Sequence, residues 1–444
     1  MKLFSQIGLF LLEKPLKNIW CKPVLLSLVF FGLSNGFLLA QSEDSTYRQL
    51  SIQLEIRPRA EFRNNFKLTS ADSISPELYV SFRNRLTVNY NSRFLNAVGS
   101  VQEIHLFGKA GEPSSVGSVN FFELYLEPKF RNFSARIGRQ GLLLDNGRMF
   151  SDAPWAQQSR SHEGVRLFYT GKKFTTDFSW AFTRPYSTDF DQSYSPVASH
   201  RYKYLLLHQL KLKLLSNVSL ATINVLDAFE NDQKKENVRL TSGGRLEYFG
   251  SGMYLTLNGF YQYGTNQNFK KITAYYLQPE IRKTIQNTTI RLGAEILSGD
   301  DLSEPTDKSK SFVPLYGVAW KFMGNMNFFT RFPVDVNSSG LVNPYLFILQ
   351  KINSKLAIRA DGHLFFSQHA LLDEKKNKAE RYLGFENDLS LNYKPMKALD
   401  INFGFSYLLA QSSVELLNKV ENSEKIPVWS YLMVSFNTEI FRTK

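Results

Sequence analysis

Residues 50–63 read LSIQLEIRPRAEFR, and apolar and polar side chains alternate along this stretch. A β-strand points successive side chains to opposite faces, so these residues would form a strand with one apolar face and one charged face. Similar stretches of roughly ten residues recur as far as Phe441, separated by tight turns or polar loops. The sequence therefore predicts an all-β protein, a transmembrane antiparallel β-barrel with short periplasmic turns and long extracellular loops.

The composition is consistent with a barrel in a membrane. Of the 444 residues, 43% are hydrophobic and 14% are aromatic. Transmembrane barrels carry belts of aromatic side chains at both membrane surfaces, which accounts for an aromatic share of this size. Beyond the N-terminus the sequence has no apolar run long enough for a spanning helix, so we expect none in the body of the chain.

The N-terminus carries a targeting signal. Residues 24–40 form an apolar segment that is interrupted by serine, glycine and asparagine and preceded by lysines. We predict a cleaved signal peptide over residues 1–40 and a barrel over residues 41–444, with an N-terminal membrane anchor as the alternative. Cys21 is the sole cysteine and lies in the predicted signal peptide, so no disulfide or cysteine site is expected in the mature chain.

The formal net charge of +13 raises the question of a nucleic-acid partner. The basic residues are spread singly along the predicted strands, as at Arg57, Arg59 and Arg63. They are not accompanied by a basic helix, a zinc-ligand spacing or a glycine-rich phosphate loop. We therefore expect no nucleic-acid partner.

Turn length reports the direction of each strand, because short turns face the periplasm and long loops face outside. The segment 321–331 (KFMGNMNFFTR) resembles a strand, but counting it would break the alternation of short and long connections. We place it in a long outer loop, residues 299–340, and predict about 18 strands, with about 16 as the fallback. The predicted tight turns are Asn91–Arg93, Lys129–Asn132, Gly171–Lys173, Ser216–Asn217, Gly250–Gly252, Ile285–Asn287, Asn353–Ser354 and Pro395–Ala398.

A barrel of this size has a lumen too wide for side chains alone to fill, and we expect a water-filled pore. The last predicted strand, residues 429–441 (WSYLMVSFNTEIF), resembles the terminal strand that the outer-membrane barrel assembly machinery recognises. This cue predicts location in the outer membrane of a Gram-negative bacterium, surrounded by lipid.

The lumen-facing residues follow from pointing the apolar face of each strand toward lipid. An Arg or Lys at the lipid midplane costs about 2–4 kcal/mol, so a slip of one residue, which exposes every charge, is strongly disfavoured. The predicted lumen arginines are Arg57, Arg59, Arg83, Arg85, Arg136, Arg166, Arg245, Arg282, Arg291 and Arg359. The predicted lumen carboxylates are Glu55, Glu61, Glu123, Glu127, Asp177, Glu247, Glu280, Glu295, Asp361, Glu386 and Asp388.

These charges admit two interpretations. Arginine and carboxylate side chains can brace a wide barrel by neutralising one another. Alternatively, an excess of guanidinium groups favours anionic solutes, because each binds a carboxylate through two hydrogen bonds. We expect the constriction to contain Arg57, Arg59, Arg83, Arg85 and Arg136.

A run of short motifs resembles the signature of the alginate export family of outer-membrane proteins, as found in Bacteroidetes-type genomes. The order and spacing of the motifs carry the resemblance, which covers nearly the whole mature chain. The motifs are Gly138-Arg139-Gln140, Asp145-Asn146-Gly147-Arg148, Trp155, Gln158, Ser159-Arg160-Ser161-His162, Val101-Gln102-Glu103-Ile104-His105, Ser298-Gly299-Asp300 and Pro314-Leu315-Tyr316-Gly317.

The resemblance implies an 18-stranded barrel with an arginine-lined passage for an acidic polysaccharide. It also implies that Arg139, Arg148 and Arg160 lie in or beside the pore, on or near a segment, residues 141–163, that folds inward. The alternative is that this segment only braces the wall. His105 and His162 stand where the family commonly has Arg and Asp, so some of the lumen charge differs here.

The sequence does not support three other classes of protein. None of the six histidines lies in a Gly-x-Ser-x-Gly elbow or a His-Glu-x-x-His helix, so we predict no enzyme, no catalytic residue, no metal site and no cofactor. A soluble sugar-binding β-protein would need several domains, but no linker rich in Pro or Gly divides the chain. A receptor with a plug domain is not expected, since the first predicted strand begins near Leu50.

The sequence thus predicts an outer-membrane channel through which anionic solutes, and an alginate-like acidic polysaccharide in particular, diffuse passively. The alternatives are a general outer-membrane porin without polymer specificity and an outer-membrane barrel enzyme.

Overall fold

The computed structural model describes residues 47–65, 76–107, 118–183, 202–231, 235–418 and 426–443. The predicted signal peptide, residues 1–40, lies outside the described residues, and so do parts of several predicted outer loops. Among the described residues, no helix has the length and apolar character needed to cross a bilayer.

The elements follow the alternation of the sequence. The first half of the chain forms β1 (Arg48–Asn64), β2 (Glu77–Ser92), β3 (Leu95–Leu106), β4 (Ser118–Phe130), β5 (Phe133–Gln140), β6 (His162–Thr170), β7 (Phe174–Phe182), β8 (Tyr204–Lys213) and β9 (Val218–Glu230). The second half forms β10 (Glu236–Gly250), β11 (Met253–Thr265), β12 (Lys271–Ile285), β13 (Thr288–Leu297), β14 (Lys308–Ser309), β15 (Leu341–Lys351), β16 (Leu356–Ser367), β17 (Tyr382–Met396), β18 (Leu399–Ala410) and β19 (Val428–Arg442). The described helices are the 3-10 turn η2 (Val334–Val336) and α3 (Ser412–Asn418).

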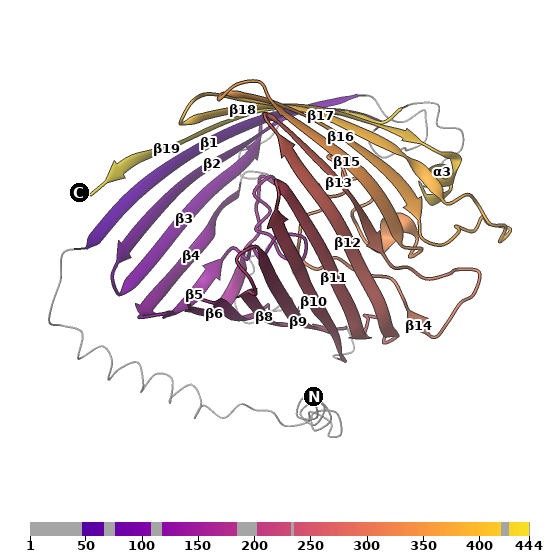
Figure 1. Cartoon of the computed structure of the whole chain (residues 1–444), viewed down its shortest axis with the longest axis horizontal. Helices are drawn as coiled ribbons and strands as arrows, with labels where there is room; N and C mark the ends of the chain where they lie inside the picture. The colour runs from indigo at the N-terminus through magenta and orange to yellow at the C-terminus, as the bar shows by residue number, and fades with distance from the viewer. Residues whose placement is uncertain are drawn as a thin grey trace, which may run out of the picture. The chain divides into compact units, whose positions relative to one another are not determined.

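The strands form one closed sheet, in which β1 pairs with both β2 and β19. Consecutive strands lie side by side in chain order (Figure 1). The exception is β14, a two-residue strand parallel to β12 within a long loop, while β13 pairs directly with β15. Without β14 the ring has 18 antiparallel strands, which confirms the predicted fold and strand number.

Each predicted tight turn joins two paired antiparallel strands. The segment 321–331 contains no strand, as the alternation of short and long connections predicts. The connection between β9 and β10 is short, because β9 extends to Glu230 and β10 begins at Glu236.

The apolar side chains face outward and the charged side chains face inward. On β1, Ile56 is 38% exposed and Arg57 is 5% exposed, and on β2, Leu86 is 43% exposed and Arg83 is 3% exposed. This alternation confirms the predicted phase of both strands. Lipid would cover the outward apolar face.

The lumen is narrower than the predicted water-filled pore. Two segments fold into it: residues 141–161 between β5 and β6, the first inward segment, and residues 298–340 between β13 and β15, the second inward segment. Their apolar side chains form one buried cluster with residues of the wall; the cluster includes Leu142, Met149, Phe150, Phe312, Tyr316, Phe322 and Met326. An 18-stranded ring leaves space that strand side chains cannot fill, and the two segments occupy part of it.

Candidate functional site

The two inward segments pair with each other across the lumen. The backbone N–H of Tyr316 donates to the carbonyl oxygen of Met149 at 2.8 Å, and its carbonyl oxygen accepts from Ser151 N–H at 3.1 Å. The Phe150 and Tyr316 rings lie 5.3 Å apart. Gly317 permits this approach, because a Cβ there would overlap the backbone of the first inward segment. The segments therefore form a single constriction.

Guanidinium groups of β1 hold the backbone of the first inward segment. Arg57 donates to the carbonyl oxygens of Pro154 at 2.6 Å and Ala156 at 2.9 Å. Arg59 donates to the carbonyl oxygen of Trp155 at 2.9 Å. A buried irregular segment must find partners for its carbonyl groups, and a guanidinium group offers five donors. These predicted pore arginines point inward and bind the inward segment.

Two arginines on β2 extend the same surface. Arg83 and Arg85 each donate to the Ser159 hydroxyl at 3.0 Å. Glu55 forms an ion pair with Arg83 and lies 3.9 Å from Arg57 and 4.0 Å from Arg85. One carboxylate thus serves three guanidinium groups, which leaves positive charge in excess. We call the set Arg57, Arg59, Arg83 and Arg85 the arginine wall.

Carboxylates on β17 hold the second inward segment. Glu386 accepts a hydrogen bond from the backbone N–H of Met326 at 2.8 Å, and Asp388 accepts one from that of Asn325 at 3.0 Å. Both side chains are buried, and Asp361 of β16 lies opposite Asp388 in the strand register. We call Glu386 and Asp388 the carboxylate wall.

Two further ion pairs tie the first inward segment to the far side of the barrel. Arg148 donates to Glu295 of β13 at 2.7 Å, and both side chains are buried. Asp145 forms two hydrogen bonds with Arg245 of β10, at 2.6 and 2.7 Å. The segment therefore spans the lumen from β1 and β2 to β10 and β13.

Arg148 and Arg160 differ in their environments. Burial by itself would lower the pKa of Arg148, but the carboxylate of Glu295 outweighs it, and the pKa lies above its ordinary value. Arg160 donates to the carbonyl oxygens of Tyr316 and Gly317, and burial lowers its pKa. Both stay charged at physiological pH. These two arginines, which the family resemblance placed in or beside the pore, lie within the constriction.

The other predicted lumen arginines mostly have carboxylate partners. Arg139 lies on β5 and binds Glu163 at 2.9 Å. Arg282 stacks on the Tyr254 ring at 4.3 Å and has no carboxylate partner among the described residues. The remaining pairs are Arg136–Glu127, Arg166–Asp177, Arg245–Glu247, Arg291–Glu280 and Arg359–Asp361.

The remaining predicted lumen carboxylates also have partners. Glu61 binds Arg59 at 2.8 Å and Arg63 at 2.9 Å. Glu123 accepts a hydrogen bond from the backbone N–H of Gly141, where the first inward segment begins.

One buried ion pair, between Asp227 on β9 and Arg239 on β10, was not predicted from the sequence. Asp227 also accepts a hydrogen bond from the Tyr316 hydroxyl at 2.8 Å. Asp227 lies two and four residues after the buried Val225 and Ile223, so it shares their inward face. Continuing the alternation of Ile223 and Val225 by two residues would have placed Asp227 in the lumen.

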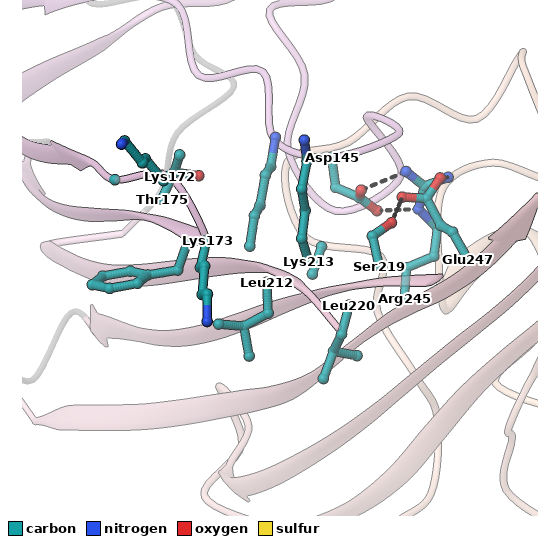
Figure 2. Close-up of a pocket in the computed structure, with 14 residues that line it drawn as sticks. Asp145, Lys172, Lys173, Thr175, Leu212, Lys213, Ser219, Leu220, Arg245 and Glu247 are labelled. Carbon is teal, nitrogen blue, oxygen red and sulfur yellow. Dashed lines mark hydrogen bonds and ion pairs between the residues drawn. The ribbon is translucent and has the colours of Figure 1, made fainter. Parts of the chain in front are cut away.

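A cavity of about 430 Å³ opens beside Asp145 of the first inward segment and the tight turn between β6 and β7. Figure 2 shows Asp145 and Arg245 on one side of this cavity and Lys172 and Lys173 on the other. Its lining also includes Lys211 and Lys213 of β8. In the part of the chain that the structure describes, none of the four lysines forms an ion pair with a carboxylate. We call this cavity the lysine pocket.

The described histidines do not gather into a metal site. His363 hydrogen-bonds to Asn343 at 3.1 Å, and His369 lies 3.6 Å from Asp301. No group of three or more His, Cys, Asp or Glu residues with metal-binding geometry occurs among the described residues.

Comparison with known proteins gave a family and a fold. The model of a family described as alginate export matches residues 48–410. No curated protein shows significant sequence similarity to this chain.

Solved structures with a similar fold include three bacterial proteins. OccK8 (OprE) of Pseudomonas aeruginosa has a TM-score of 0.58 at 12% identity, covering 88% of this chain and 98% of that one. OpdO of Pseudomonas aeruginosa has a TM-score of 0.60 at 11% identity, covering 88% and 98%. OccAB4 of Acinetobacter baumannii has a TM-score of 0.60 at 11% identity, covering 89% and 99%. At these identities the likeness concerns the fold alone.

Proposed function

Since this chain belongs to the alginate export family and is therefore a multi-pass barrel of the outer membrane, we propose that its lumen is a passive channel that favours anionic solutes. An acidic polysaccharide built of uronate units is the leading substrate, as the family's description suggests. The matching family is one of transport proteins, and we propose no catalytic activity and no bound cofactor. Assembly through recognition of β19 by the barrel assembly machinery is part of the proposal.

The observation that carries the anion preference is the excess of cationic groups over carboxylates along the path. Glu55 is shared by three arginines of the arginine wall, and the lysines of the lysine pocket form no ion pair with a described carboxylate. Cations at a pore mouth raise the local concentration of anions and lower the barrier for their entry. A solute from the periplasm would meet the lysine pocket first and the constriction second.

The arginines predicted to set selectivity are Arg57, Arg59, Arg83, Arg85 and Arg136, and this role remains a prediction. Four of them bind the first inward segment or its immediate partners, so replacing them changes the shape of the pore together with its charge. The lysines of the lysine pocket offer a cleaner test, because they hold no segment in place.

The test is the reversal potential of single channels in a KCl gradient. We expect chloride preference in the wild type and a fall in the anion-to-cation permeability ratio of about threefold or more in Lys211→Glu/Lys213→Glu, since two charges change sign beside the path. Lys283→Glu is the matched control, because Lys283 lies near the same membrane edge but on the outward face of β12. Cation preference in the wild type would contradict the proposal.

A further inference from the structure

A second cavity in the lumen lies on the wall from β15 to β19, about half the ring away from the lysine pocket. Its volume is about 320 Å³, within the range of small-molecule pockets. Both inward segments contribute to it, through Trp155 and Trp320, and the wall adds Trp429 and Tyr431 of β19. We call it the tryptophan pocket.

Three of the chain's five tryptophans line this one cavity. The rings of Trp155 and Tyr431 lie 4.7 Å apart with an interplanar angle of 72°, and those of Trp429 and Tyr431 lie 4.8 Å apart. Tryptophan in a barrel is ordinarily found at the membrane surfaces, where its ring meets lipid headgroups. Trp180, 41% exposed on the outward face of β7, fits that pattern, and the three in the lumen do not.

Polar groups lie beside these rings. Arg359 of β16 binds Asp361 through Nε and Nη2, which leaves Nη1 without a partner among the described residues. Its guanidinium group stacks on Phe347 at 4.8 Å, so its orientation is fixed. The side-chain NH2 group of Asn392 on β17 donates to Asn402 at 2.7 Å and to Asp400 at 2.5 Å, and its side-chain amide oxygen accepts no hydrogen bond from a described residue. Trp429 and Tyr431 are buried, at 4% and 8% exposure, whereas Trp155 and Trp320 are partly exposed. The pocket thus offers the rings of Trp155 and Trp320, an amide acceptor and one edge of a guanidinium group.

This combination matches the chemistry of a pyranose ring that carries a carboxylate. The C–H groups on one face of a pyranose carry partial positive charge and lie favourably on the negative face of an aromatic ring. Its hydroxyl groups donate to amide oxygens, and its carboxylate accepts from a guanidinium group. We propose that the tryptophan pocket binds one uronate ring of a polymer as it passes the constriction. The inference rests on the proposed function and adds a specific sugar subsite to it.

The test is the time for which a short ligand blocks single-channel current in a planar bilayer. The probe is tri-D-mannuronate, and tricarballylate supplies three carboxylates without a sugar ring. We expect tri-D-mannuronate to block the wild type about tenfold longer than tricarballylate, in line with the strength of ring stacking in proteins. Trp155→Leu should remove that difference, because it deletes a ring on which the sugar would lie. The backbone carbonyl oxygen of residue 155 can still accept from Arg59 in this variant.

Matched variants separate binding from folding. Trp180→Leu, outside the lumen, should retain the tenfold difference. Asn392→Leu removes the amide from the wall without touching either inward segment, and it should also shorten the block by tri-D-mannuronate. Two results would overturn the proposal that this pocket binds a uronate ring. One is equal block times for the two ligands in the wild type, and the other is wild-type block times in both Trp155→Leu and Asn392→Leu.

A neutral sugar tests the role of Arg359. Maltotriose should block for a shorter time than tri-D-mannuronate, and equal times would overturn recognition of the carboxylate. Chloride preference in the KCl gradient is measured on the same channels. If the block times contradict the subsite but chloride is still preferred, the subsite is wrong and the proposed anion channel is retained. If chloride is not preferred, the proposed function itself is contradicted.

Discussion

The arginine wall binds the first inward segment through backbone carbonyl oxygens, whereas the carboxylate wall binds the second inward segment through backbone N–H groups. The positive guanidinium groups bind the partly negative carbonyl oxygens, and the carboxylate oxygens bind the partly positive N–H groups. Arg57 and Arg83 each reach the carbonyl oxygens of both Pro154 and Ala156, while each carboxylate of the other wall accepts from one backbone N–H group. The charges of the two walls are therefore occupied in shaping the constriction, whereas the lysines of the lysine pocket form no ion pair with a described carboxylate.

The strongest challenge to this comparison is removal of the carboxylate wall. Glu386→Ala/Asp388→Ala deletes two acceptors of buried backbone N–H groups, and each buried donor left without a partner costs about 1–3 kcal/mol, so we expect unfolding to become easier by about 2–6 kcal/mol. The second inward segment should leave the lumen and single-channel conductance should rise. Urea unfolding in detergent and conductance in bilayers measure the two effects. Unchanged conductance would show that the wall does not hold the segment.

The arginine wall is tested by a substitution that preserves charge. In Arg57→Lys a single ammonium group cannot reach both the Pro154 and Ala156 carbonyl groups, so we expect a loss of about 1.5–3 kcal/mol and more frequent opening and closing of the channel. Arg282→Lys is the control, because Arg282 contacts neither inward segment in the described structure. If Arg57→Lys behaves like that control, the positive charge alone is sufficient.

The smallest effect is expected from Glu386→Gln. The amide oxygen still accepts from Met326 N–H, and the substitution removes one charge from a site shared with Asp388 and faced by Asp361. The free energy of unfolding should change by less than about 1 kcal/mol, and conductance should match that of the wild type. A large loss of stability in urea would show that the carboxylate wall needs its charge as well as its oxygen atoms.

The sequence was sufficient to predict the ring but not the contacts that hold the constriction together. Alternation placed Ile56 outward and Arg57 inward, and turn parity kept residues 321–331 out of the strand count, because both signals are local. The partner of Arg57, by contrast, is a carbonyl group 97 residues away, in a segment without periodicity. A periodic pattern reveals which way a side chain points and not what it meets there.

The candidate site shows the same division. The family resemblance predicted Arg148 and Arg160 near the pore, and the segment that carries them folds inward. The aromatic cluster at Trp155, Trp320 and Trp429 had no signal in the sequence, since the three residues come from two loops and a distant strand. They meet only in the closed barrel.

The second inward segment begins and ends at one place. Asp300 N–H donates to the Ser338 carbonyl oxygen at 2.7 Å, and Gly299 and Gly340 are so close that neither has room for a side chain. Because β13 and β15 pair directly, the shell is complete whether few or many residues connect them. Insertions and deletions in this segment would change the width and lining of the channel and leave the barrel in the membrane unchanged. Changes in this one segment can thus alter which solutes pass in proteins that descend from one gene.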